Sequence, residues 1–260
     1  MAVALAATHP TLGSVQHNYT VATSAAAGGV ALPVAAPNGV VEGAGLTPLR
    51  PLAPGSIVSI FGTGFAGGNY FASRVPLERT LGGTSVRIGS EDAPLYYVGP
   101  TQINAQVPFT AAVGETVSIV VNANGKLTAP QSYLIAPVQP GIFSGAVIDV
   151  QNNAIVTASR PAQLGHELII YSNGLGRVEQ EVASGAASPQ AQALLPVTVT
   201  IGGVEVPVSY AGLTPSFVGL NQVNVTLSGS VPTGDNIPVI VKQNGIESNP
   251  NLPILVSIRP

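Results

Sequence analysis

Short stretches in which apolar and polar residues alternate run through most of the chain. Val86 and Ile88 alternate with Ser85 and Arg87, and the run Val197–Ile201 alternates β-branched apolar residues with threonine. This period of two is the pattern of a β-strand with one buried face. We expect strands near residues 38–42, 56–61, 84–88, 93–97, 102–107, 116–122, 131–136, 153–158, 166–172, 197–201, 204–210, 221–227, 237–243 and 253–258.

The chain also repeats itself. The segment QINAQV at Gln102–Val107 returns as QVNVTL at Gln222–Leu227, and VSIFGTG at Val58–Gly64 returns as LIIYSNG at Leu168–Gly174. The spacing grows from 110 to 120 residues along the chain, which indicates matched strands joined by loops of different length. A segment that occurs twice is more economically interpreted as scaffold than as a unique site.

Turn signals divide each repeat into many short strands. Asn124-Gly125 and Asn244-Gly245 suit the positive φ of a type I′ turn, and Gly202-Gly203 does the same between two alternating runs. Seven short strands in roughly 100 residues are typical of an immunoglobulin-like sandwich. We therefore predict an all-β fold with two tandem immunoglobulin-like β-sandwiches at residues 36–140 and 141–260, after an extended arm at residues 1–35.

The link between the two predicted sandwiches is the segment APVQPGIF at residues 136–143. Its two prolines lie close together and make it short and semi-rigid. We therefore expect the two sandwiches to keep a fairly fixed end-to-end relation.

Composition narrows the function classes. The chain is 45% hydrophobic but only 8% charged, with a formal net charge of -3. Without a basic patch, neither nucleic acid nor an anionic membrane surface is an expected partner. The absence of cysteine excludes disulfides, cysteine-ligated metals and cysteine nucleophiles. No apolar run reaches the length of a membrane helix, and the start MAVALAATHP is equally consistent with a signal-peptide stub or a plain terminus.

Several of the repeated motifs resemble a known family. They are LAPGSIVSIFGTGFA at 52–66, LGGTSVRIG at 81–89, APLYYVGPTQINAQVP at 93–108, PVTVTIGG at 196–203 and SYAGLTPSFVGLNQVNV at 209–225. They look like a repeated C-terminal domain of secreted bacterial proteins, found in Acidobacteria such as Solibacter and similar to the IPT/TIG (E-set) sandwiches. This resemblance implies an extracellular or cell-surface protein and carries over no catalytic residue.

Residues that could act in catalysis or bind a metal are few. His9 and His17 lie outside the predicted sandwiches, and His166 opens a strand whose counterpart in the first repeat is Ser56. The aspartates Asp92, Asp149 and Asp235 are each expected alone in a turn. The segment GSED at 89–92 is the nearest approach to a calcium loop, but we favour a plain turn. We therefore expect no catalytic residue, no metal site and no cofactor.

Two long loops stand at matching places, at residues 64–83 and 173–196, and loops of this length tend to be functional. The first carries Phe65, Tyr70 and Phe71, a large share of the few aromatic residues. Exposed aromatic rings suit protein contacts or sugar stacking. The alternative is that these rings plug the open end of the sandwich.

The arm contains one alternating stretch, in which Val15, His17, Tyr19 and Val21 point to one side. This predicts a strand of about eight residues without an evident partner in its own fold. The strand could pack along its own domains, or it could add to a neighbouring subunit by donor-strand complementation. Head-to-tail donation of this kind builds a filament.

The leading expectation is a non-catalytic, secreted structural protein that assembles with itself into a filament or surface layer through the arm. The alternative is a cell-surface adhesion or binding module that uses the aromatic loop 64–83 to bind a glycan or a protein. A weaker third possibility is an accessory domain of an enzyme.

Overall fold

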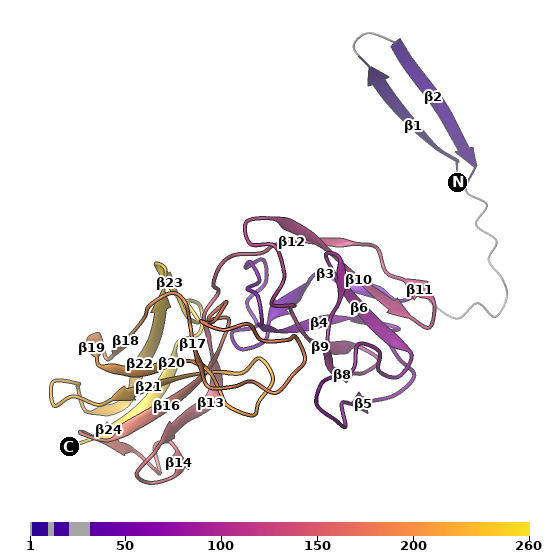
Figure 1. The fold of residues 1–260 in the computed structure, drawn as a ribbon. Coiled ribbons are helices and arrows are strands. Elements are labelled where there is room, and N and C mark those ends of the chain that lie inside the picture. The colour runs from indigo at the N-terminus through magenta and orange to yellow at the C-terminus, as the bar shows by residue number, and fades with distance from the viewer. Residues whose placement is uncertain (1, 10–12, 21–31) are drawn as a thin grey trace. The chain divides into compact units, whose positions relative to one another are not determined.

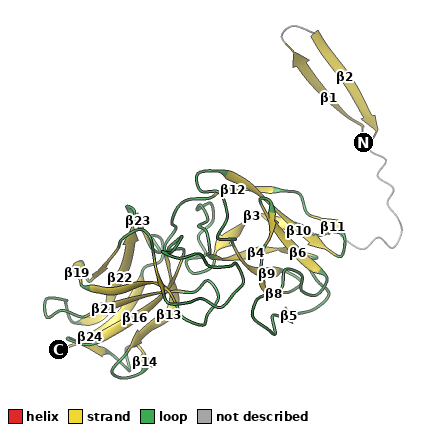
Figure 2. Ribbon diagram, in the orientation of Figure 1, coloured by secondary structure: helices red, strands yellow, loops and turns green. Residues whose placement is uncertain are grey.

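The computed structural model describes residues 2–9, 13–20 and 32–260, and all regular structure in these ranges is β-strand (Figures 1 and 2). The chain forms two compact units, Met1–Ala31 and Leu32–Pro260. Within the described ranges, no helix is long and apolar enough to cross a membrane. The all-β prediction is therefore confirmed.

The first unit contains a single hairpin. Strands β1 (Ala2–His9) and β2 (Gly13–Thr20) pair antiparallel, from Ala2 opposite Thr20 to His9 opposite Gly13. The strand that we expected to lack an evident partner in its own fold has one, because β2 pairs with β1, which precedes it in the chain. Sequence alternation marked β2 but not β1, in which residues 2–7 are all alanine, valine or leucine.

The first sandwich of the second unit consists of ten strands. They are β3 (Val34–Glu42), β4 (Ile57–Thr63), β5 (Tyr70–Phe71), β6 (Thr84–Ile88), β7 (Glu91–Asp92), β8 (Leu95–Val98), β9 (Gln102–Gln106), β10 (Thr116–Ala123), β11 (Lys126–Leu127) and β12 (Gln131–Leu134). One sheet has the order β3-β4-β9-β8-β5, and the other has the order β11-β10-β6-β7 with β12 also paired to β10. Val58, Ile60 and Ile103 fill the space between the sheets and are fully buried.

The second sandwich consists of twelve strands. They are β13 (Gly141–Asp149), β14 (Ala154–Ile155), β15 (Ala162–Gln163), β16 (Glu167–Asn173), β17 (Ala191–Gln192), β18 (Val197–Ile201), β19 (Val204–Val206), β20 (Val208–Leu213), β21 (Asn221–Thr226), β22 (Gly234–Gln243), β23 (Ile246–Glu247) and β24 (Ile254–Arg259). Its sheets have the orders β14-β13-β16-β21-β20-β17 and β15-β24-β22-β18-β19, with β23 paired to β22. Its core is a separate cluster that includes Leu168, Ile170 and Val223.

The start of the second sandwich differs from the sequence prediction. The nine-residue strand β13 begins at Gly141, inside the segment that we expected to be a link, and the predicted strand at 153–158 shrinks to the two residues of β14. A bulge between Ile142 and Val147 interrupts the pairing of β13 with β16. Gly141 and Gly145 and this bulge hide the alternation on which the prediction depended.

The predicted turns are confirmed where they join neighbouring strands. Asn124 and Gly125 have φ of 50° and 81°, and Asn244 and Gly245 have φ of 49° and 79°. Each pair connects two antiparallel strands with two residues between them, β10 to β11 and β22 to β23. Asparagine and glycine tolerate this left-handed backbone better than other residues.

Candidate functional site

The three aromatic residues proposed for contact in the loop 64–83 do not share one environment. Phe65 is fully buried in the core of the first sandwich, and its carbonyl oxygen accepts a hydrogen bond of 2.6 Å from Thr84 Oγ1. Phe65 therefore cannot form an exposed contact, and its place in the prediction is wrong. Tyr70 and Phe71 form β5 and are 40% and 69% exposed. These two rings remain available to a ligand.

The repeat itself could have placed Phe65 correctly. Phe65 aligns with Leu175, at the same offset of 110 residues that relates the two strands before them. Leu175 is also fully buried. An apolar residue that recurs at one position of both repeats is a core signal.

Of the arm residues proposed for subunit contact, Val15, His17 and Tyr19 lie on β2, opposite Ala7, Leu5 and Val3. Val21 lies outside the described residues. The proposed contact through this segment stays a prediction.

Beside Phe71, a row of aromatic and amide side chains crosses the outer face of the first sandwich. Ser59 on β4 lies opposite Asn104 on β9, Asn104 lies opposite Tyr97 on β8, and Tyr97 lies opposite Phe71 on β5. The Phe71 and Tyr97 ring centroids are 5.0 Å apart with the rings tilted by 45°. A bulge between Leu95 and Tyr97 brings the tyrosine opposite the asparagine.

The outer face of the second sandwich carries the same arrangement. Asn224 on β21 lies opposite Tyr210 on β20, next to an equivalent bulge between Val208 and Tyr210. Gln222 lies opposite Tyr171 on β16, as Gln102 lies opposite Phe61 in the first sandwich. Within each strand the glutamine Nε2 donates to the asparagine Oδ1, at 2.8 Å in the first sandwich and 3.1 Å in the second.

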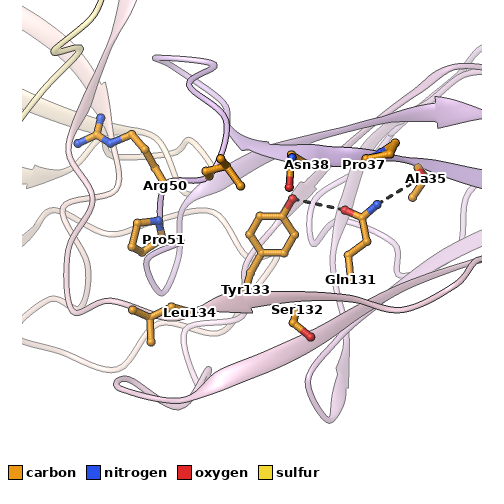
Figure 3. Close-up of a pocket in the computed structure, with 10 residues that line it drawn as sticks. Ala35, Pro37, Asn38, Arg50, Pro51, Gln131, Ser132, Tyr133 and Leu134 are labelled. Carbon is orange, nitrogen blue, oxygen red and sulfur yellow. Dashed lines mark hydrogen bonds between the residues drawn. The ribbon is translucent and has the colours of Figure 1, made fainter.

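A cleft of about 580 Å³ opens between β3 and β12 of the first sandwich (Figure 3). Gln131 Nε2 donates across it to the carbonyl oxygens of Ala35 at 3.3 Å and Ala36 at 2.6 Å, and the Tyr133 hydroxyl accepts from Val40 N at 3.2 Å. Side chains of β12 thus satisfy the backbone along the outer edge of β3. This protects an edge strand from pairing with another chain.

The cleft is nearly neutral. Its lining contains no carboxylate, and its one cation, Arg50, points away from Gln131 and Tyr133 and donates from Nη2 to the carbonyl oxygen of Glu247 at 3.0 Å. Burial lowers the pKa of Arg50, against the opposing effect of Glu42. Burial also raises the pKa of Tyr133, against the hydrogen bond from Val40. The cleft therefore offers hydrogen bonds and apolar surface rather than charge.

A buried polar network joins the two sandwiches. Asn173, at the end of β16, donates from Nδ2 to Glu42 Oε1 at 2.6 Å and to the carbonyl oxygen of Ile57 at 2.8 Å, and its Oδ1 accepts from Ile57 N at 2.8 Å. The Glu42 carboxylate, only 1% exposed, also accepts from the backbone N–H groups of Ala44 and Gly45. Buried hydrogen bonds to a charged group are the strong class, so this network fixes the joint.

The loop 173–196 contributes further contacts to the joint. Gly185 N donates to Gln106 Oε1 at 2.6 Å, Ser184 Oγ accepts from Phe109 N at 3.0 Å, and Arg177 Nη2 donates to the carbonyl oxygen of Ala111 at 3.1 Å. A second cleft of about 800 Å³ lies beside these contacts, between Phe109 and residues 177–183. The second long loop therefore binds the first sandwich, including the first long loop, where Leu77 N donates to the carbonyl oxygen of Gly185 at 2.8 Å.

A second buried carboxylate was missed by the sequence analysis. Asp149, at the end of β13 and 1% exposed, accepts from the backbone N–H groups of Gln151 and Asn152. Its Oδ2 lies 2.8 Å from His166 Nδ1. The prediction that Asp149 stands alone in a turn is wrong, because its partner is 17 residues away. No cluster of three metal-ligating side chains exists within the described ranges.

Comparison with known proteins identifies one domain type. Residues 47–135 match the model of the IPT/TIG domain. This match, together with the two packed sheets, shows an immunoglobulin-like sandwich in the first repeat. No curated protein matches the chain in sequence.

Three solved structures are among those to which this chain is similar. They are a surface glycan-binding protein from Prevotella bryantii (12% identity, 84% of this chain and 41% of that one, TM-score 0.29), a surface glycan-binding protein from a xyloglucan utilization locus of Bacteroides uniformis (13%, 86% and 48%, 0.27) and domains 5–6 of the S-layer protein SbsC (14%, 87% and 98%, 0.29). The chain spans less than half the length of the first two.

Proposed function

We propose that this protein is a non-catalytic extracellular structural protein that assembles with copies of itself into a filament or surface layer. The observation that carries the proposal is the joint at Glu42 and Asn173, which ties the two sandwiches into one hydrogen-bonded body. A subunit of an extended assembly must hold its parts in fixed relation. The motif resemblance to secreted Acidobacterial domains supports the extracellular location, and we propose that both repeats belong to that family.

The contact between subunits is assigned to the N-terminal strands. The sheet formed by β1 and β2 has two strands only, so each strand has one edge without a partner in that sheet. An isolated two-stranded hairpin is marginally stable in water, and an unpaired edge is a template for another strand. Pairing with a neighbouring subunit through backbone hydrogen bonds would both stabilise the hairpin and satisfy the unpaired edge.

The test compares the full chain with a chain that begins at Leu32, by negative-stain electron microscopy and analytical ultracentrifugation. A start at Leu32 keeps Val34 and Ala35, which pair with β4. We expect filaments or sheets only from the full chain. Equal assembly by both chains, or none by either, would contradict the assignment.

A pair of variants separates backbone pairing from side-chain contact. Replacing both His17 and Tyr19 by proline removes two N–H donors from β2 and should abolish assembly. Replacing the same two residues by alanine keeps the donors and should leave assembly largely intact. Loss of assembly in the alanine variant as well would mean that the side chains of His17 and Tyr19 make the contact, and assembly by the proline variant would exclude pairing through these two N–H groups.

A second function is favoured by the exposure of Phe71, which is 69% exposed and packs on Tyr97. Large exposed aromatic rings next to polar groups are typical of binding surfaces. We propose as the alternative that the protein is a cell-surface adhesion or binding module for a glycan or a protein, with loop 64–83 at its contact surface. A ligand that stabilises a monomer against heat would favour this alternative.

A further inference from the structure

On the outer sheet face of each sandwich, a glutamine and an asparagine form an amide pair in which the glutamine is the donor and the asparagine is the acceptor. In the first sandwich Gln102 Nε2 donates to Asn104 Oδ1, and Ser59 Oγ donates to the same oxygen at 3.2 Å. Gln102 Oε1 and Asn104 Nδ2 make no hydrogen bond to the part of the chain that the structure describes. Each pair therefore presents one free acceptor and one free donor, side by side on the same face of a strand.

The second sandwich presents the same free groups. Gln222 Nε2 occupies Asn224 Oδ1, which leaves Gln222 Oε1 and Asn224 Nδ2 without a partner among the described residues. All four amide residues are partly exposed. The two faces thus offer the same hydrogen-bonding pattern although their other loops have diverged.

An aromatic ring flanks each amide pair on both sides. Phe61 and Tyr97 flank the first pair, and Tyr171 and Tyr210 flank the second. A sugar ring combines apolar C–H faces with hydroxyl groups that both donate and accept. An aromatic face beside one donor and one acceptor complements these two properties at once.

We propose that each sandwich binds a neutral polysaccharide on this outer face, through Gln102, Asn104 and Tyr97 in the first sandwich and Gln222, Asn224 and Tyr210 in the second. None of these side chains is charged, which favours a neutral ligand over an anionic one. Two equivalent faces on one chain favour a polymer over a single sugar, because both can engage one long ligand.

The two faces should differ in strength. The first adds Phe71, whose exposed ring lies 5.0 Å from the ring of Tyr97. In the second, Tyr210 lies near β17, which is Ala-Gln, and its hydroxyl donates to the backbone oxygens of Leu213 at 2.7 Å and Ala191 at 3.1 Å. The first face is therefore the stronger site.

This inference rests on the second of the two functions proposed above, but it names a sheet face where that proposal names a loop. Its readout is also independent of assembly. If the unchanged chain forms filaments but binds no neutral polysaccharide, the sugar site alone is overturned; if it binds a neutral polysaccharide but forms no filament, the structural proposal alone is overturned.

The experiment is affinity electrophoresis of the full chain in gels that contain hydroxyethyl cellulose, galactomannan or dextran, with polygalacturonate as the anionic probe. We expect retardation by at least one neutral polymer and none by polygalacturonate. Changing Phe71 and Asn104 together to alanine should weaken binding about tenfold or more. Changing Tyr210 and Asn224 to alanine should have a smaller effect, and the fourfold variant should not bind.

The matched control is Phe217→Ala, which removes an aromatic residue of 54% exposure that lies outside both faces. It should bind like the unchanged chain. Absence of retardation by all three neutral polymers would overturn the proposal, and so would an equal loss in the Phe217→Ala control. Stronger retardation by polygalacturonate than by the neutral polymers would overturn the assignment of a neutral ligand.

Discussion

The first strand of each sandwich ends at a residue with a buried carboxylate, Glu42 in the first and Asp149 in the second. The two carboxylates differ in where their side-chain hydrogen-bond partners come from. Glu42 lies opposite Val58 and Asp149 lies opposite Leu168, the same position of the repeat. Both accept two backbone N–H groups from the turn that follows. The remaining partner of Glu42 is Asn173 of the other sandwich, whereas the side-chain partners of Asp149, His166 and Asn152, come from its own.

The backbone N–H group of the next strand shows the same difference between the two sandwiches. Ile57 N donates to Asn173 Oδ1 across the joint, while the equivalent Glu167 N donates to Gln151 Oε1 within the second sandwich at 3.0 Å. In the first sandwich this end of the repeat is completed by a residue of the other sandwich. In the second sandwich the same end is completed by that sandwich's own side chains. The comparison indicates that the same buried carboxylate serves as a joint in one sandwich and as a closed end in the other.

The largest effect should come from breaking the joint. Asn173→Ala removes three hydrogen bonds and leaves Glu42 and the Ile57 backbone underpaired in a buried place. We expect a loss of about 2–4 kcal/mol in the free energy of unfolding, measured by urea denaturation. The control is Thr63→Ala, at the matching exposed position of the first repeat. Similar losses from both variants would contradict the role of the joint.

Breaking the closed end should cost less. His166→Ala removes one partner of Asp149, but Asn152 Nδ2 and two backbone groups still donate to that carboxylate. The expected loss is about 1–2 kcal/mol by thermal or urea unfolding. Glu167→Gln, which keeps the backbone donor, is the control. A loss larger than that of Asn173→Ala would reverse the comparison.

Alkaline pH provides a third test at the joint. The Tyr96 hydroxyl donates to the carbonyl oxygen of Val218 at 3.0 Å, so Tyr96→Phe should cost about 1 kcal/mol at neutral pH. Burial raises the pKa of Tyr96 above the ordinary value of 10.0. The folded state therefore keeps the phenol neutral while the unfolded state ionises it, and stability should fall as pH rises above about 10. The phenylalanine variant should lose less between pH 9 and 11, and an unchanged slope would contradict this cause.

The smallest effects should be equal in the two sandwiches. Gly125 and Gly245 have φ of 81° and 79° in matching turns, and a Cβ at either would meet open space. Replacing either by alanine should cost only the backbone strain, about 1 kcal/mol. Differential scanning calorimetry of the two variants tests this. A clear inequality would show that the turns are less alike than their backbones.

The sequence predicts the elements whose signal is local. Alternation places β6, β9, β18 and β21 almost to the residue, and Asn-Gly pairs place the two tight turns. It fails for β13, whose glycines and bulge interrupt the period of two. It fails also for β1, which has no polar alternation.

The candidate sites depend more on long-range pairing. Tyr70 and Phe71 were found because aromatic residues are rare in this chain, but burial of Phe65 depends on strands that come later in the sequence. The contacts of Ser184 and Arg177 with the first sandwich cross more than 60 residues of chain. The sequence shows the Gln-x-Asn repeat but indicates only scaffold for it, because the aromatic residues that face it lie on strands whose pairing the sequence does not reveal.

Gly141 sets a limit on how the two halves could be exchanged between related proteins. A Cβ at this position would come within 2.6 Å of Glu42 Oε2. The side chain of Glu42 in the first sandwich therefore leaves room only for glycine at the first residue of the second. A chimera that joins this first sandwich to a foreign second one would need glycine at the junction and asparagine at the position of Asn173. We therefore expect the two sandwiches to be exchangeable only together, as one unit.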